Sequence, residues 1–229
     1  MTALYTSVGH FEKRTGANGN FYPVVIVNRC EYMVSIPEMI VWTSLCWRIL
    51  DLRRIQARYE QRIGETGLEL CAKSDETLER LVRRGLVVCG LGSSGADALY
   101  DLLDNLYNVP VTSNPFVKAL SFLKLFLLDG HSFHVATGAF RRVKLTQNEK
   151  LVIDLARQAQ LSTTEMIRCV EVGAFDISDD MKVLETIYDD DETTCDNVAS
   201  YARFYEQWRP VLAAVSNLYL KKQILFERY

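Results

Sequence analysis

Apolar and polar residues alternate along the first part of the chain in the way that is typical of strands. Ala3–Lys13 and Phe21–Asn28 flank a turn-rich stretch over residues 15–20. A second short turn, Asn28–Glu31, leads into Tyr32–Ile36. The pattern therefore predicts an N-terminal region of β-hairpins.

From residue 37 the apolar spacing changes to that of helices. It predicts helices over Pro37–Leu50, Asp51–Ile63 and Ser74–Arg84, with Pro37 at a favourable first position and Asp51 as an N-terminal cap. Four apolar residues of the second helix share one face, at spacings i, i+3, i+7 and i+11: Leu52, Ile55, Tyr59 and Ile63. This face is expected to pack in a core.

One pattern occurs twice: a helix closes on two basic residues and runs directly into an apolar strand. The first copy has Arg83-Arg84 before Leu86–Cys89, with Gly85 as the C-terminal cap of the helix. The second copy has Lys221-Lys222 before Ile224–Phe226. Two copies predict two related domains in one chain.

The rest of the second half also has helical spacing. Thr146-x-x-Glu149 and Ser162-x-x-Glu165 are capping boxes, each followed by apolar residues at helical intervals. Further helices are expected at about Asp180–Tyr188, Cys195–Tyr205 and Pro210–Lys222.

The longest apolar run, Phe116–Leu128, is interrupted only by one narrow polar stripe of Lys118, Ser121 and Lys124. It is shorter than the roughly 20 residues that span a bilayer, so no membrane partner is expected. A helix that is apolar over most of its circumference must be buried. This one is expected either to fill a core between the domains or to meet its own copy in a homodimer.

Charge is distributed unevenly. The formal net charge is −3, so a surface for nucleic acid must be local. Lys118–Lys150 holds six basic and two acidic residues, whereas Asp176–Asp196 holds nine acidic and one basic. The second half is therefore less suited to DNA than the first.

Cysteine usage indicates a reducing compartment. The six cysteines form no C-x-x-C pair and lie mostly in apolar stretches, which is typical of buried thiols in a cytoplasmic protein. The first residues lack the basic segment and apolar run of a secretion signal.

Arginines gather on the second and third predicted helices. Such side chains suit phosphate oxygens and guanine edges. The candidate DNA-contacting residues are Arg54, Arg58, Thr77, Arg80, Arg83 and Arg84. The alternative is a solvated face on which the arginines pair with Glu60, Glu76 and Glu79.

Both halves resemble winged-helix domains, the broad family that includes many bacterial repressors. The first half matches in the three helices of residues 37–84, the strand Leu86–Cys89 and the glycine-rich tip Gly90–Gly95; the second matches in its last three helices and Ile224–Phe226. The resemblance implies a helix-turn-helix transcription regulator with one helix in the major groove. The second half stops where a returning wing strand is needed, so that strand is either missing or supplied by another segment.

The first half also resembles the small peptide-binding domains of the PqqD type. These pair a short N-terminal strand region with a three-helix bundle of winged-helix kind. Tyr32–Ile36, Glu38–Trp42 and Leu81–Val87 carry the likeness. It implies binding of protein or peptide instead of DNA.

Motifs for catalysis, cofactors and metals are lacking in the sequence. No P-loop, H-E-x-x-H or G-x-S-x-G motif occurs. Gly90-x-Gly92-x-x-Gly95 has the spacing of a dinucleotide loop but no surrounding βαβ pattern, which favours a wing tip. His131 and His134 stand on a segment expected to be extended, where i and i+3 side chains point to opposite faces. No cofactor, metal site or enzyme activity is therefore predicted.

The sequence thus predicts an α+β protein, mainly α with small β elements. Its expected segments are a β region plus winged-helix-like domain (1–110), the apolar helix and linker (111–144), and a second winged-helix-like domain (145–229). The expected function is that of a cytoplasmic, homodimeric regulator that binds double-stranded DNA; the alternative is a protein- or peptide-binding module. One continuous surface of unpaired arginines favours DNA, and arginines paired with carboxylates favour the module.

Overall fold

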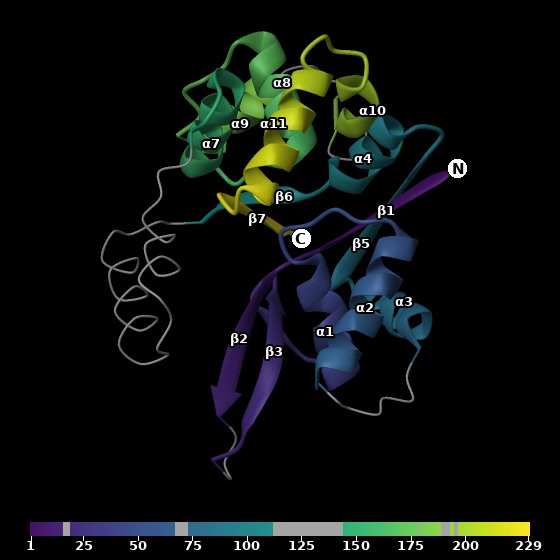
Figure 1. The fold of residues 1–229 in the computed structure, drawn as a ribbon. Helices are drawn as coiled ribbons and strands as arrows, with labels where there is room; N and C mark the ends of the chain where they lie inside the picture. The colour runs from purple at the N-terminus through teal and green to yellow at the C-terminus, as the bar shows by residue number, and fades with distance from the viewer. Residues whose placement is uncertain (16–18, 67–72, 112–143, 179, 189–192, 195–196) are drawn as a thin grey trace.

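The computed structural model describes residues 1–15, 19–66, 73–111, 144–178, 180–188, 193–194 and 197–229. These residues form an α+β protein, which confirms the expected class. Figure 1 shows two groups of helices with short strands between them. None of the described helices is long and apolar enough to cross a bilayer. The expected helix at Phe116–Leu128 lies outside the described residues, so the homodimer that depends on it stays a prediction.

The first unit contains one pair of strands and three helices. β1 (Thr2–Ser7) pairs antiparallel with β5 (Val87–Gly92), and the helices lie between them in sequence. They are α1 (Ile36–Leu45), α2 (Leu52–Thr66) and α3 (Ser74–Arg83). As expected, Asp51 caps α2, since its carboxylate accepts the Arg54 N–H at 2.9 Å.

An additional sheet is inserted between β1 and α1. It contains β2 (His10–Thr15), β3 (Phe21–Val27) and β4 (Cys30–Met33) in that spatial order. Asn28 and Arg29 join β3 to β4 with φ angles of 46° and 62°. Two consecutive positive φ angles define the hairpin turn that fits strand twist, so the expected second hairpin is confirmed.

The second unit repeats this plan. β6 (Tyr107–Pro110) pairs antiparallel with β7 (Ile224–Glu227), and the sequence between them contains α7 (Gln147–Gln158), α8 (Thr163–Val172) and α11 (Trp208–Leu220). Two further helices, α9 (Asp180–Ile187) and α10 (Val198–Ala202), come between α8 and α11. The second unit therefore includes β6, although the sequence assigned residues 1–110 to the first domain.

Equivalent hydrogen bonds show that the two units share one plan. The first strand of each bonds to the residue that precedes the N-cap of the second helix: the Tyr5 N–H donates to the Leu50 carbonyl at 2.8 Å, and the Asn108 N–H donates to the Leu161 carbonyl at 3.0 Å. The first strand then pairs with the strand that follows the third helix. The duplication suggested by the two basic helix ends is thus present in the structure.

The turn that ends the third helix is also the same in both units. The Gly85 N–H donates to the Val82 carbonyl at 3.0 Å, and the Lys222 N–H donates to the Tyr219 carbonyl at 2.9 Å. Gly85 has φ 70° and Lys222 has φ 60°. Each helix therefore ends in a left-handed residue, as the sequence indicated for Gly85.

Of the two alternatives for the strand beside β7, the structure shows the second, since another segment supplies it. β6 takes that place beside β7, and β1 takes it beside β5. The helices α7, α8 and α11 of the second unit correspond to α1, α2 and α3 of the first. The winged-helix resemblance instead used the last three helices of the chain, so that α9 and α10 wrongly took the first two places. The repeat was misaligned because α9 and α10 are inserted just before the recognisable basic helix end.

The glycine-rich stretch after α3 is not a wing tip. Its first half continues β5, whose only strand partner among the described residues is β1, and α4 (Gly95–Leu103) follows at once with Ser94 as its N-cap. A Cβ atom at Gly90 would lie 2.3 Å from the Ala98 carbonyl oxygen. Glycine is needed there because β5 packs directly on α4.

Two helix boundaries differ from those expected. α1 ends at Leu45, because Leu50 pairs with Tyr5 and so cannot extend the helix. α2 continues through Gly64, where a Cβ would meet nothing within 4 Å. A glycine in an exposed helix weakens it by about 1 kcal/mol but does not end it.

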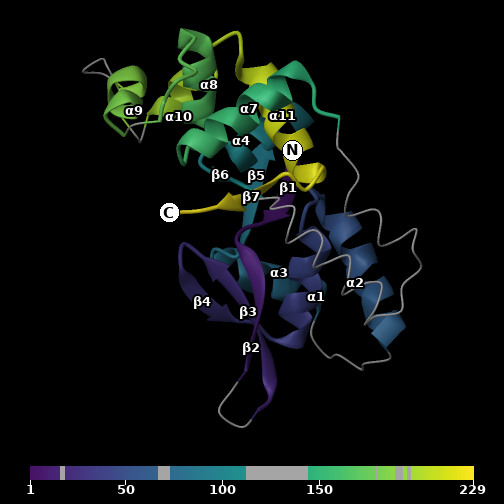
Figure 2. The same cartoon turned by 90° about the vertical axis from the view of Figure 1, so that its left-hand side faces the viewer.

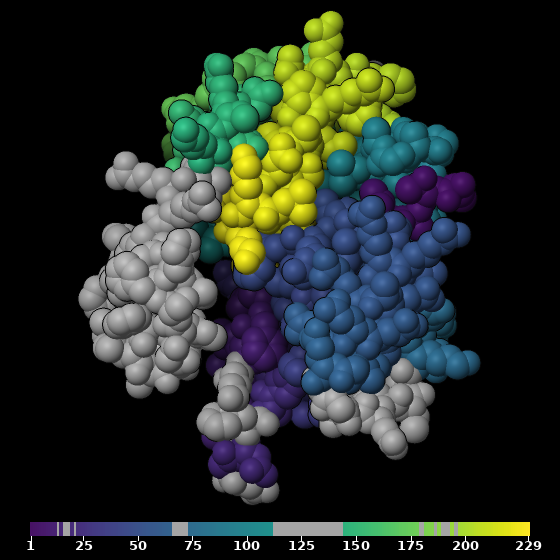
Figure 3. Space-filling model, in the orientation of Figure 1, coloured from purple at the N-terminus to yellow at the C-terminus, as the bar shows by residue number. Residues whose placement is uncertain are grey.

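The two units are joined by a buried tyrosine of α11. The Tyr219 hydroxyl accepts the Trp47 N–H and also lies within hydrogen-bond distance of Thr6 Oγ1, each at 3.0 Å. The Gly9 N–H also donates to the Phe226 carbonyl at 2.8 Å. Figure 3 shows the C-terminal segment lying against the first half of the chain.

Candidate functional site

The basic residue that closes α3 holds the first unit together. Arg84 Nη1 lies 2.9 Å from Glu38 Oε1, and Nη2 donates to the Met33 carbonyl. Glu38 also accepts the Ser35 N–H at 2.8 Å and is mostly buried. Burial alone raises the pKa of Glu38, but the hydrogen bonds from Ser35 and Arg84 outweigh burial and hold this pKa below its ordinary value. Arg84 is therefore committed to the fold, and its assignment as a DNA contact is corrected.

The second unit has the same ion pair at the same place. Lys221 follows the last residue of α11 and lies 2.7 Å from both carboxylate oxygens of Glu149. Glu149 is the third residue of α7 and accepts the Thr146 N–H at 2.9 Å, as Glu38 does from Ser35. We call these two pairs the helix clamps. The repeated basic helix end is thus explained by packing.

Thr77 is also removed from the predicted DNA-contacting set. Its side chain is fully buried, and its hydroxyl donates to the Lys73 carbonyl at 2.9 Å. Thr77 lies on the inward face of α3 with Leu78 and Leu81, both of which are also buried. A DNA contact would require Thr77 to face outward, as Arg80 does.

The remaining predicted arginines are exposed and fall into two groups. Arg54 is 3.5 Å from Asp51, and Arg83 is 2.7 Å from Glu79. Within the described ranges no ion pair is formed by two others, Arg58 and Arg80. Since Arg84 is clamped, the four arginines Arg54, Arg58, Arg80 and Arg84 do not form the continuous unpaired surface expected for DNA.

A free strand edge lies beside the end of α3. Among the described strands β4 is the outer one of its sheet and pairs with β3 alone (Figure 2). Val27 and Cys30 flank a two-residue turn and form a hydrogen-bonded pair, so the backbone groups of Glu31 and Met33 point away from β3. The outward carbonyl of Met33 accepts a hydrogen bond from Arg84. The N–H groups of Glu31 and Met33 have no partner within the part of the chain that is described.

A groove of about 330 Å³ runs between this strand and α3. Its apolar lining comes from Val27, Tyr32 and Val82. Its cationic lining is Arg83, Arg84 and Arg228. The groove therefore combines apolar surface and positive charge, and it lies beside the strand that carries the free backbone donors. Sequence reasoning missed it because Arg228 lies far from β4 in the chain.

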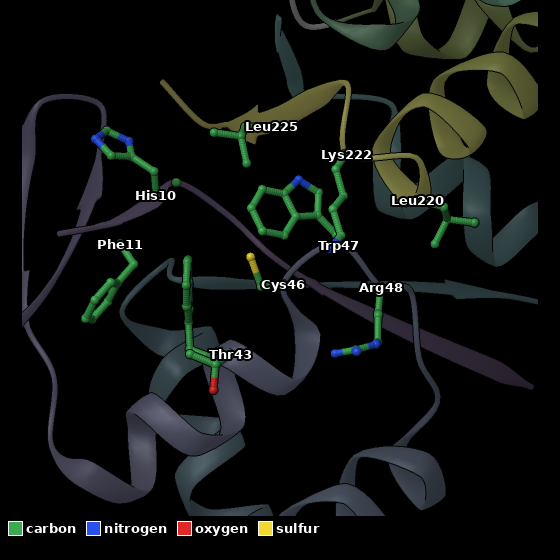
Figure 4. Close-up of a pocket in the computed structure, with 11 residues that line it drawn as sticks. His10, Phe11, Thr43, Cys46, Trp47, Arg48, Leu220, Lys222 and Leu225 are labelled. Carbon is green, nitrogen blue, oxygen red and sulfur yellow. The ribbon is translucent and has the colours of Figure 1, made fainter. Parts of the chain in front are cut away.

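A second cavity, of about 670 Å³, lies where the two units meet (Figure 4). The first unit contributes Trp42, Cys46, Trp47 and Arg48, and the second contributes Lys222 with its neighbours. None of these residues belongs to the predicted site. No signal in the sequence joins residues 42–48 to residues 220–225.

Metal-binding clusters were sought among the residues with described positions. No group of three His, Cys, Asp or Glu side chains there could hold a metal ion. His131 and His134 lie outside the described residues.

Comparison with known proteins gives no assignment: no family model, curated protein or solved structure matches the chain.

Proposed function

We propose that the chain is a peptide-binding interaction module in which an extended peptide adds to the free edge of β4. The observation that carries the proposal is the pair of outward N–H groups on Glu31 and Met33, beside the groove at the end of α3. An exposed edge is a template for another strand, and this mode of recognition takes its affinity from backbone hydrogen bonds.

The lining of the groove specifies the chemistry of the peptide. Tyr32 and Val82 offer apolar contact, and Arg228 forms no ion pair with any described residue. Among the described residues Arg83 forms an ion pair with Glu79 alone, and the two side chains are 74% and 64% exposed. Such a pair is weak and exchanges readily for another carboxylate. The expected partner is therefore an extended peptide with an apolar side chain next to an acidic one.

The likeness of the first half to PqqD-type peptide-binding domains supports the same function. The inserted β2–β4 sheet followed by α1–α3 has the strand-then-three-helices order implied by that likeness. The four free cysteines of the described ranges fit the expected cytoplasmic location. The proposal assigns no catalysis to the chain.

Short random peptides displayed on phage and selected on the intact protein would test the proposal. The affinity of a selected peptide is then measured for wild type, Glu31→Ala and Glu31→Pro. Both variants lose the Glu31 side chain, but only proline removes the outward N–H, without breaking a ladder bond. We expect Glu31→Ala to bind like wild type and Glu31→Pro to bind about tenfold more weakly.

Circular dichroism shows whether Glu31→Pro is folded, and Met33→Pro repeats the experiment at the other outward N–H. Failure to select any peptide, or equal affinity for the alanine and proline variants, would count against the proposal.

DNA binding is kept as the second candidate function because Arg58 and Arg80 are exposed without ion pairs in the described part of the chain. A gel shift with random duplex DNA at low and moderate salt, on wild type and on the Arg58→Ala/Arg80→Ala variant, measures it. Binding that weakens in the variant, with a salt slope lower by roughly 0.9 per lost phosphate contact, would support this candidate.

A further inference from the structure

The cavity at the junction of the units is independent of the peptide groove and of the exposed arginines. The first unit provides Trp42, Cys46 and Trp47, and the second provides Lys222 and Leu225 (Figure 4). Its volume, about 670 Å³, is in the range of sites for small molecules. Apolar and aromatic side chains form most of the wall, and cationic groups lie among them.

The shape of the cavity is fixed by contacts between the units. Trp47 has φ 54°, an unfavourable conformation for a bulky side chain. The Tyr219 hydroxyl holds it there by accepting the Trp47 N–H at 3.0 Å. The next residue is also anchored, because Thr6 Oγ1 donates to the Arg48 carbonyl at 3.0 Å. Strain of this kind persists where surrounding contacts determine the backbone, and it occurs often at ligand sites.

Two positive charges of the cavity have no counter-ion among the described residues. Arg48 and Lys222 form no ion pair within the described residues. Arg48 Nη1 reaches the Ser44 carbonyl at 3.3 Å, and Lys222 Nζ lies 5.5 Å from the centre of the Trp47 ring. Burial raises the pKa of the Cys46 thiol, while both cations act to lower this pKa. Both charges therefore lie on the wall of the cavity that Cys46 also lines.

The comparison of the two units makes Lys222 informative. Gly85 stands at the equivalent place in the first unit, and glycine adopts a positive φ without strain. Lysine adopts it only at some loss of stability. The backbone conformation at position 222 favours glycine. We therefore attribute the lysine there to a role of its side chain, which lines the cavity.

We propose that this cavity binds a small organic anion with a flat aromatic body. Arg48 and Lys222 hold its acidic group, and the indole rings of Trp42 and Trp47 contact its ring system. Charge complementarity argues for an anion, because two cations that form no ion pair with a described residue line the same cavity. The aromatic walls argue for a flat apolar body.

Fluorescence titration with two matched probes tests this inference. 1-Anilinonaphthalene-8-sulfonate is a flat aromatic anion, and N-phenyl-1-naphthylamine has the same ring system without the charge. We expect the intact chain to bind the sulfonate about tenfold more tightly than the neutral compound, because a charged hydrogen bond in a partly closed site has this effect.

The variants Arg48→Gln and Lys222→Gln separate charge from shape. Each should lose the preference for the sulfonate while still binding the neutral compound, which shows that the cavity remains intact. Lys150→Gln, which removes an exposed cation on α7, is the matched control and should bind like wild type. If one variant no longer binds the neutral compound, the substitution has disrupted the cavity. The probe affinities of the other variant then decide whether the cation is needed.

Three results would overturn the proposal: no binding of the sulfonate, equal affinity for the two probes, or an unchanged preference in both glutamine variants. Since neither variant alters β4 or α3, these outcomes are separate from those of the peptide experiment.

Discussion

The two units share a backbone plan and a helix clamp but differ in what surrounds them. In both, a cation after the third helix bonds to the third residue of the first helix, as Arg84–Glu38 and as Lys221–Glu149. Features present in both units are explained by packing. We assign the proposed functions to features that only one unit has among the described residues. These features are the β2–β4 sheet and the side chain of Lys222.

The difference also shows how a repeated motif can mislead. Two basic helix ends suggested two winged-helix domains, yet the structure uses one residue of each to satisfy a buried carboxylate. Tyr219, which links the units, takes the place that Val82 has in the first unit. The specialised residues are thus found by asking where equivalent positions hold different side chains.

The largest expected effect is loss of the clamp in the second unit. Glu149 is more deeply buried than Glu38, with side-chain exposures of 1% and 9%. Lys221→Met leaves that carboxylate without its cation and should lower the free energy of unfolding by about 3 kcal/mol. Arg84→Met should lower it by less. Urea unfolding measures both, with exposed Lys150→Met as the control, and an equal, small effect of all three would contradict the clamp.

The same clamp makes a pH-dependent contribution. Burial raises the pKa of Glu149, but hydrogen bonds from Lys221 and Thr146 outweigh burial, and the folded pKa lies below its ordinary value of 4.5. A lowered carboxylate pKa stabilises the fold above the ordinary value and loses that contribution as pH falls through the folded pKa. We therefore expect wild type to lose stability relative to Glu149→Gln as pH falls below 4.5. Parallel pH profiles of the two proteins would refute this.

A smaller effect is expected at the link between the units. Tyr219→Phe leaves the Trp47 N–H without its acceptor, and an unsatisfied buried donor costs about 2 kcal/mol. Tyr201→Phe, on the exposed side chain of α10, should have little effect. Thermal unfolding measures both; a Tyr219→Phe protein as stable as the Tyr201→Phe protein would mean that the link is dispensable.

The smallest effect comes from exchanging the residues that end the third helices. Lys222→Gly should stabilise the protein by about 1 kcal/mol, because it relieves a left-handed lysine. Gly85→Lys should destabilise it by a similar amount. The two changes in the free energy of unfolding, read from urea curves, should have opposite signs; two losses of stability would mean that Lys222 has a structural role.

Local features of the fold were predictable from the sequence. The caps at Asp51, Thr146 and Ser162, the turn at Asn28-Arg29 and the end of α3 at Gly85 were all identified, because each depends on residues adjacent in the chain. The α+β class followed from the spacing of apolar residues. Helix boundaries near Leu50 were missed because a strand from the start of the chain pairs there.

Long-range features were not predictable. Pairing of β1 with β5, and of β6 with β7, joins segments separated by whole sets of helices, and no local pattern specifies such a partner. The residues next to Thr77 in the sequence do not reveal whether its side chain faces solvent or α2. The groove and the junction cavity depend on these pairings, so the candidate sites emerged only with the structure.

The central claim is that a peptide binds at the free edge of β4. Hydrogen–deuterium exchange of the intact chain with and without a selected peptide tests it most directly, because it shows which backbone amides the peptide protects. The account predicts slower amide exchange at Glu31, at Met33 and at the end of α3, with the helices of the second unit unchanged. Slower exchange confined to the outer faces of α2 and α3 around Arg58 and Arg80, or to the second unit, would contradict it.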